Sequence, residues 1–190
     1  MVKLYALSVL YKNPTSATIL KGAYDVESFS FFQRKSVKEF MTFISKTIVE
    51  RTQSCSRQSV KEGDNLAAVL ISDHEYPRRV AHTLITKVMD EFATKYPQSV
   101  WDTLSEVMTD FAQINIYLVK YQNPNEADAL TKIQNDLDET KIILHGTLEA
   151  VLKRGENVDE LVSKSQVLSV QSKAFYKTAR KTNSCCSLAP

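Results

Sequence analysis

From Pro124 to Thr182 the sequence reads PNEADALTKIQNDLDETKIILHGTLEAVLKRGENVDELVSKSQVLSVQSKAFYKTARKT. Alternating steps of three and four residues, begun at Leu130, define a seam of sixteen positions. Ten are apolar, five are Ser or Thr, and one is Arg154. The apolar positions are Leu130, Ile133, Leu137, Leu144, Val151, Val158, Leu161, Leu168, Phe175 and Ala179. A heptad seam of this length predicts one long coiled-coil helix.

The beginning of this helix has its own sequence signal. Asn123 offers an N-cap side chain, Pro124 suits the first helical position, and Glu126 stands where a carboxylate can reach back to the cap. Gly146 and Gly155 each weaken an isolated helix by about 1 kcal/mol. Without partner helices, we therefore expect the segment after Pro124 to be either disordered or folded back over the first helix of the protein.

Arg154 places one charge in an otherwise apolar or hydroxyl seam. A guanidinium carries five donors and stays charged, so burying it is costly unless acceptors surround it. In a parallel homodimer two copies of Arg154 would face and repel each other. The seam therefore favours a hetero-assembly whose partner helices bring acceptors to that layer. An ordinary amphipathic helix interrupted by one polar residue remains an alternative on spacing alone.

Length and composition narrow the class of protein. A chain of 190 residues can hold one modest core plus an extended segment. Its formal net charge of +2 is too small to indicate nucleic-acid binding. Three cysteines, two of them adjacent, offer no disulfide framework and fit a reducing compartment. No window approaches the roughly 18 uninterrupted apolar residues of a transmembrane helix, and we interpret the first ten residues as a strand.

The first 120 residues carry strand and helix signals in turn. The predicted elements are strands over 2–10 and 17–24, a helix over 37–51, a strand over 66–72, a helix opened by Pro77, and a third helix from Trp101 to Leu118. The first helix is expected to open on a capping box, Ser36-x-x-Glu39. This order predicts an α+β fold in which helices cover a small antiparallel sheet.

Residues 130–182, with Val151-Leu152-Lys153-Arg154 at their centre, resemble an R-SNARE motif. The runs Leu137–Lys141 and Lys173–Lys181 narrow the likeness to the lipid-anchored longin R-SNAREs, and it spans nearly the whole chain. The resemblance implies that Arg154 pairs with three glutamines from three partner helices, in the central ionic layer of a parallel four-helix bundle. It also implies that this bundle drives vesicle-membrane fusion, with the protein in the cytosol and on the cytosolic face of ER, Golgi, vesicle and endosomal membranes.

The N-terminal region resembles the longin domain, a profilin-like α+β fold. Three runs match well: Phe31–Arg34, Phe40–Phe43 and Glu75–Pro77. The likeness implies that Phe40 and Phe43 belong to a hydrophobic surface that receives the folded-back segment. It also implies three parts, a longin-like domain over 1–120, the R-SNARE motif over 124–182 and a lipidation tail over 183–190.

One departure from the longin pattern concerns the sheet. The longin sheet has five strands, two of them between the first and second helices, yet only the run 66–72 occurs there in this chain. Gly63-Asp64-Asn65 stands where the additional strand and its turn should be. A missing interior strand leaves unpaired sheet edges.

Cys185 and Cys186 follow a basic segment that contains Lys173, Lys177, Arg180 and Lys181. In the family the second cysteine is prenylated and the first acylated, and two such lipids make a stable anchor. Cys186 is fifth from the end as the sequence is written, whereas prenyltransferases act on the fourth, so the prenylation motif is interrupted. The basic segment either complements the helix dipole or attracts anionic lipid.

Signals for enzyme chemistry are weak. The histidines are scattered, no Cys–His spacing suits zinc, and no glycine-rich phosphate loop occurs, so we expect no metal, no cofactor and no enzyme. One alternative is a longin adaptor whose C-terminal helix folds permanently onto the N-terminal domain. The off-seam residues that could make that contact are Ile142, Ile143, Leu148, Leu152 and Val162. A second alternative, thiol or acyl transfer by Cys185 or Cys186, lacks a positioned base.

Overall fold

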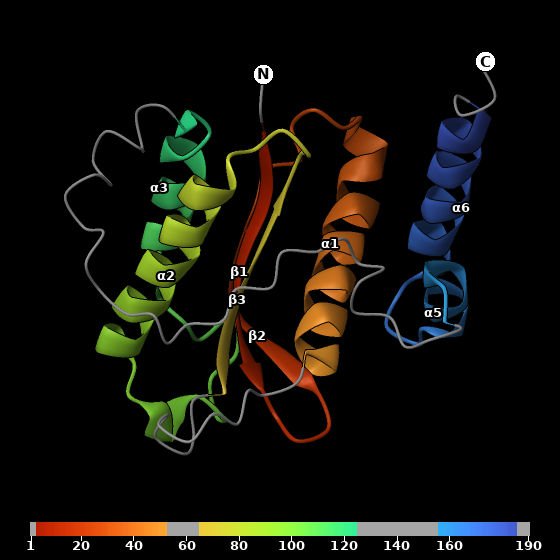
Figure 1. The fold of residues 1–190 in the computed structure, drawn as a ribbon. Coiled ribbons are helices and arrows are strands. Elements are labelled where there is room, and N and C mark those ends of the chain that lie inside the picture. The colour runs from red at the N-terminus through yellow and green to blue at the C-terminus, as the bar shows by residue number, and fades with distance from the viewer. Residues whose placement is uncertain (1–2, 53–64, 125–155, 186–190) are drawn as a thin grey trace. The chain divides into compact units, whose positions relative to one another are not determined.

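The computed structural model describes residues 3–52, 65–124 and 156–185 (Figure 1). The chain divides into two compact units, one of residues 1–25 with 45–145 and one of residues 26–44 with 146–190. Helix α1 (Phe31–Arg51) contributes to both, because the division falls within it.

The first unit is built on a sheet whose described strands are β1 (Leu4–Lys12), β2 (Ala17–Tyr24) and β3 (Leu66–Ser72). Their order is β2-β1-β3, and both pairs are antiparallel, as predicted. The turn between β1 and β2 is closed by a bond from the Asn13 N–H to the Ser16 carbonyl, 2.8 Å long. Strand β1 begins and ends two residues later than the sequence predicted. Residues 53–64, where the longin pattern has its additional strand, lie outside the described residues.

Both faces of this sheet carry apolar clusters. Helices α2 (Arg78–Lys95) and α3 (Gln113–Lys120) pack against one face with β1 and β2. The buried residues of α2 are Val80, Leu84, Val88 and Phe92, at the helical spacing that the sequence predicted. A second cluster joins Val49, near the end of α1, to Leu10, Ala17, Ile19 and Val69. Since Val69 and its neighbour Leu70 belong to different clusters, the two clusters lie on opposite faces.

The predicted third helix is wrong over most of its length. After a short 3₁₀ turn, η1 (Gln98–Val100), residues 101–112 form turns, and only α3 is helical. Donors from elsewhere in the unit bind the backbone carbonyls that a helix would use. Lys21 Nζ donates to the Thr109 carbonyl at 2.6 Å, and the Tyr96 hydroxyl donates to the Asp110 carbonyl at 3.0 Å. Trp101 and Phe111 are buried although this segment is not helical, whereas Met108, predicted on the same apolar face, is 72% exposed.

The predicted start of the first helix is also wrong. Helix α1 begins at Phe31, six residues earlier, where the N–H groups of Gln33 and Arg34 donate to the Ser30 carbonyl. Ser36 is consequently inside the helix and buried, so it cannot cap it. Glu39, the other residue of the predicted capping box, contacts a different part of the chain.

The second unit contains α5 (Val158–Lys164) and α6 (Val170–Cys185). Pro124 is helical, as its predicted N1 position requires, and residues 125–155 lie outside the described part of the chain. The prediction of one continuous helix is wrong for residues 156–185, because residues 165–169 are not helical. Local polar side chains stabilise the break. Ser165 Oγ accepts from the Val167 and Leu168 N–H groups, and Ser169 Oγ accepts from the Ser172 N–H as an N-cap of α6, each at 3.2 Å.

Candidate functional site

The candidate site is the contact between the first half of α1 and α6, both within the second unit. Glu39 on α1 accepts three hydrogen bonds from the N-terminal end of α6. The Ser169 N–H donates at 2.6 Å, the Ser169 hydroxyl at 2.8 Å and the Ser172 hydroxyl at 2.6 Å. One carboxylate thus binds a helix terminus that lies 130 residues further along the chain. A negative charge at this position also interacts favourably with the helix dipole.

These bonds set the charge state of Glu39. Burial raises the pKa of its carboxyl group, but the hydrogen bond from Ser172 lowers it, and so do the bonds from Ser169 and the charge of Lys35. The lowering effects prevail, and the pKa lies below its usual value of 4.5. Glu39 is therefore a carboxylate at neutral pH and acts as an acceptor only.

An aromatic contact continues the site, between Phe40, which follows Glu39 on α1, and Tyr176, one turn beyond Ser172 on α6. The rings of Phe40 and Tyr176 stack with their centroids 5.3 Å apart and their planes 25° apart. Phe43 also lies beside Phe40, with the centroids of their rings 6.3 Å apart. Of the two phenylalanines predicted to receive the folded-back segment, Phe40 therefore contacts Tyr176 directly and Phe43 supports the Phe40 ring.

Tyr176 also connects α6 to α5. Its hydroxyl donates to Asp159 Oδ1 at 2.9 Å, and burial raises the pKa of Tyr176, which keeps this donor protonated. Arg180 forms an ion pair with the same Asp159. Lys173 Nζ donates to the Ser163 carbonyl at 2.9 Å. Two residues of the predicted basic segment, Lys173 and Arg180, thus bind groups on α5 within the second unit.

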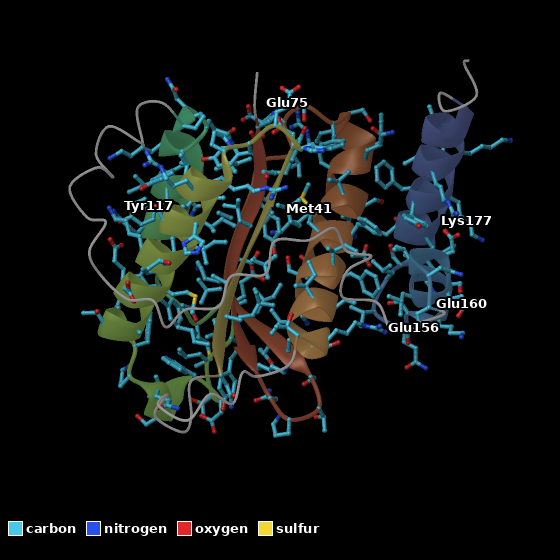
Figure 2. The ribbon with its side chains drawn as sticks, viewed as in Figure 1. Met41, Glu75, Tyr117, Glu156, Glu160 and Lys177 are labelled. Carbon is cyan, nitrogen blue, oxygen red and sulfur yellow. The ribbon has the colours of Figure 1, made fainter. Side chains whose placement is uncertain are left out.

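A hollow of about 650 Å³ lies between α5 and α6. Figure 2 labels Glu160 on α5 and Lys177 on α6, which are among the charged side chains that line it. Carboxylates come from α5 and basic groups from α6, so the two short helices present complementary charges to each other. We refer to residues 156–185, with α5 and α6, as the docked segment.

The docked segment contains the last part of the predicted seam. Leu168 is 5% exposed, Ser172 is fully buried, and Val158, Leu161, Phe175 and Ala179 are partly buried. The off-seam Val162 is also buried. The earlier seam residues, from Leu130 to Val151, lie outside the described residues, and so do Arg154 and Cys186. Cys185 is the last residue of α6.

Sequence reasoning missed Glu39, Ser169 and Tyr176 as site residues. The sequence pattern assigns Glu39 to a helix cap, because sequence alone shows only its local neighbours. Tyr176 carries a weak signal, an aromatic residue beside the seam in an otherwise basic segment. Ser169 carries no signal apart from its suitability as an N-cap.

Two family models match the chain. The Longin model, described as a regulated-SNARE-like domain, matches residues 26–118, and the Synaptobrevin model matches residues 129–187. A "Synaptobrevin homolog ykt6" of Schizosaccharomyces pombe is 46% identical over 198 residues, covering 99% of this chain and 100% of the relative. The chain belongs to this family of Ykt6 synaptobrevin homologues. Relatives named "Synaptobrevin homolog YKT6" from Debaryomyces hansenii and Yarrowia lipolytica are 46% and 44% identical, over 97% and 98% of this chain and 98% and 100% of their own lengths.

Membership of the Ykt6 family confirms the resemblance to the longin R-SNAREs and the α+β longin fold. The protein is an R-SNARE of vesicle trafficking, and the adaptor alternative is not favoured. SNAREs of the synaptobrevin type pair with other SNARE helices and work in membrane-associated trafficking, and they are a non-enzymatic class of protein. None of the helices in the described ranges is long and apolar enough to span a membrane. Within those ranges, no three His, Cys, Asp or Glu side chains gather as metal ligands would.

Proposed function

We propose that this R-SNARE alternates between a closed state, in which the docked segment covers the first half of α1, and an open state that enters a parallel four-helix bundle. The observation that supports this is the double use of Leu168 and Ser172. Both are seam positions, and both are buried in the docked segment. A side chain cannot pack in the closed contact and in a bundle layer at the same time. Docking and bundle formation therefore compete for the same residues.

In the open state the partners are three SNARE helices that each contribute one glutamine. The side-chain oxygens of three glutamines supply acceptors to Arg154, which satisfies the donors of a buried guanidinium. The ten apolar seam residues, from Leu130 to Ala179, form the layers whose association draws two membranes together. Arg154 fixes the register because no other layer accepts its charge.

The anchor is formed by acyl groups on Cys185 and Cys186, assisted by the basic residues of α6, because the prenylation motif at Cys186 is interrupted. One lipid chain binds a membrane marginally, and a second signal makes the attachment stable. The working location is the cytosol and the cytosolic face of ER, Golgi, vesicle and endosomal membranes. This proposal is supported by the adjacent cysteines, the basic segment and the membership of the Ykt6 family.

The test of the bundle mixes the full chain with three glutamine-bearing SNARE helices and maps inter-helix register by site-specific crosslinking. The wild-type chain should give one register. Arg154→Ala should still form a bundle of equal or higher stability, because an apolar layer avoids the desolvation cost of the guanidinium. Its crosslinks should spread over more than one register.

Arg154→Lys serves as the matched control, since it keeps the charge but loses the planar fork of donors. It should retain a single register with a less stable bundle. Identical registers and partner choice in the wild type and Arg154→Ala would remove Arg154 from this role, and failure of any bundle to form with glutamine-bearing helices would overturn the proposed function.

A further inference from the structure

Three side chains of α6 bind groups on α5, across the break between the two helices. The Tyr176 hydroxyl donates to Asp159 Oδ1 at 2.9 Å, and the Arg180 guanidinium forms an ion pair with the same carboxylate. Lys173 Nζ donates to the Ser163 carbonyl at 2.9 Å. The bonded position moves back along α5 as it moves forward along α6. The chain therefore reverses its direction between the two helices.

These contacts cannot form in one continuous helix. An α-helix rises 1.5 Å per residue, so Asp159 would lie about 26 Å from Tyr176 and about 31 Å from Arg180. Ser163 and Lys173 would lie about 15 Å apart. A bundle that takes up residues 158–179 as one helix must therefore break all three contacts.

The start of α5 also belongs to the two-helix form. Asn157 has an extended backbone, with φ of −131° and ψ of 158°, and its side chain accepts from the Glu160 N–H at 2.8 Å as an N-cap. Asp159 lies in the first turn, where a carboxylate interacts favourably with the helix dipole. In a continuous helix Asn157 would be helical and this terminus would not exist.

Glu160, the neighbour of Asp159, makes a different kind of contact. It pairs with Lys164 on the same helix, four residues further along, with 3.4 Å between Glu160 Oε2 and Lys164 Nζ. That pair can remain in any helix that contains both residues. Of these two neighbouring carboxylates, Asp159 is the one whose printed side-chain partners lie on the other helix.

Asp159 and its two partners lie outside the seam. Asp159, Tyr176 and Arg180 each follow a seam residue directly and are not seam positions themselves. They supply no layer to a bundle, so replacing them removes a contact of the two-helix form and leaves every layer in place.

We propose that Asp159 is a positioning residue that holds α5 to α6 and thereby opposes the continuous helix of the bundle. It acts through Arg180 and Tyr176, and it is separate from Glu39, whose partners at the start of α6 it does not share. This inference rests on the proposed entry into a bundle and adds a second contact that must be lost before entry.

Amide exchange of the full chain without partner helices tests whether Asp159 holds α5. Asp159→Asn removes the charge at nearly constant size and should raise exchange in α5 about threefold, because partly exposed ion pairs are weak. Exchange in α6, still bound by Glu39, should change little. Glu160→Gln is the matched control, since it removes the same charge from the same turn, and it should exchange like the wild type. Equal effects of the two substitutions would overturn the proposal.

A double-mutant cycle tests whether Asp159 acts through Arg180. Asp159→Asn and Arg180→Gln remove the same ion pair, so the double variant should raise exchange in α5 no more than Asp159→Asn alone. Asp159→Glu keeps the carboxylate and should retain most of the protection. Fold-changes that multiply in the double variant would show that the two residues act independently, which would overturn the proposed route.

Bundle formation with three glutamine-bearing SNARE helices tests the consequence. Asp159→Asn should form the bundle about threefold faster, with an unchanged melting temperature of the finished bundle. Combined with Glu39→Gln, the accelerations should multiply, because the two carboxylates share no partner. Faster exchange in α5 without faster assembly would overturn the opposing role of Asp159. Failure of the wild-type chain to form any bundle would instead contradict the proposed function, and exchange in α5 would still decide whether Asp159 holds that helix.

Discussion

At the scale of single residues, Glu39 determines how α6 is held. Its carboxylate accepts from a backbone N–H and two hydroxyl groups, so one side chain satisfies both the N-terminus of α6 and its first turn. Hydrogen bonds to a charged acceptor are roughly twice as strong as neutral ones. Docking at this point therefore depends on the charge of a single group.

The charge of Glu39 makes docking dependent on pH. Its pKa is lower in the docked form than its usual value of 4.5, so it stabilises docking above that value and ceases to do so as the pH falls through the lowered pKa. We expect amide exchange in α6, corrected for intrinsic rates, to rise below about pH 4.5 relative to exchange in α2. Glu39→Gln should weaken docking by on the order of 1 kcal/mol and abolish this pH dependence. A pH dependence that persists in Glu39→Gln would assign the effect to another group.

At the scale of elements, the docked segment contains two short helices, α5 and α6, whereas a SNARE bundle requires one continuous helix. The break at residues 165–169 is stabilised by Ser165 and Ser169, and the latter is bound by Glu39. Entry into a bundle must replace these local bonds with continuous helical ones. The stacked rings of Phe40 and Tyr176 add an apolar contact between α1 and α6.

Removal of that stack should release α6. Tyr176→Ala and Phe40→Ala each remove one ring, which is worth about 0.5–1.5 kcal/mol beyond buried area. Phe43→Glu adds a like charge one turn from Glu39 and should also release the helix. Amide exchange in α6 is expected to rise several-fold in all three variants, and partner helices should bind faster.

Tyr176→Phe is the matched control for the stack, since it keeps the ring and loses only the bond to Asp159. Its exchange should resemble that of the wild type. If all four variants exchanged like the wild type, the ring contact would contribute nothing to docking.

At the scale of the whole molecule, the proposed membrane attachment has to coexist with the proposed closed state. Lys173 and Arg180 are engaged by Ser163 and Asp159 while α5 and α6 are docked, which leaves fewer basic groups for anionic lipid. The lipid chains proposed on Cys185 and Cys186 must then provide most of the binding energy. The basic residues add about 1 kcal/mol each when they are free near the surface.

Serine substitutions separate these contributions. We expect Cys185→Ser with Cys186→Ser to lower the membrane-bound fraction in cells to the weak, salt-sensitive level of the basic segment. Either single variant should retain an intermediate fraction. Cys55→Ser, far from the basic segment in sequence, should leave the fraction unchanged. An unaltered membrane fraction in the double variant would mean that neither cysteine carries the anchor.

Local sequence was sufficient wherever an element depends on its own neighbours. The bounds of β2 and β3, the buried face of α2 and the helical position of Pro124 follow from alternation, i to i+4 spacing and proline geometry. The family resemblance likewise rested on contiguous runs such as Val151–Arg154. These signals act over a few residues, so they are visible without the fold.

Contacts between distant residues decided the rest. Residues 101–112 carry helical spacing but form turns, because Lys21 and Tyr96 bind their carbonyls. Glu39 has the sequence position of a capping residue but binds Ser169 and Ser172, and the predicted continuous helix is interrupted at that point. Local spacing predicts which backbone bonds a segment can make, whereas donors and acceptors brought from elsewhere in the chain decide which of those bonds it makes.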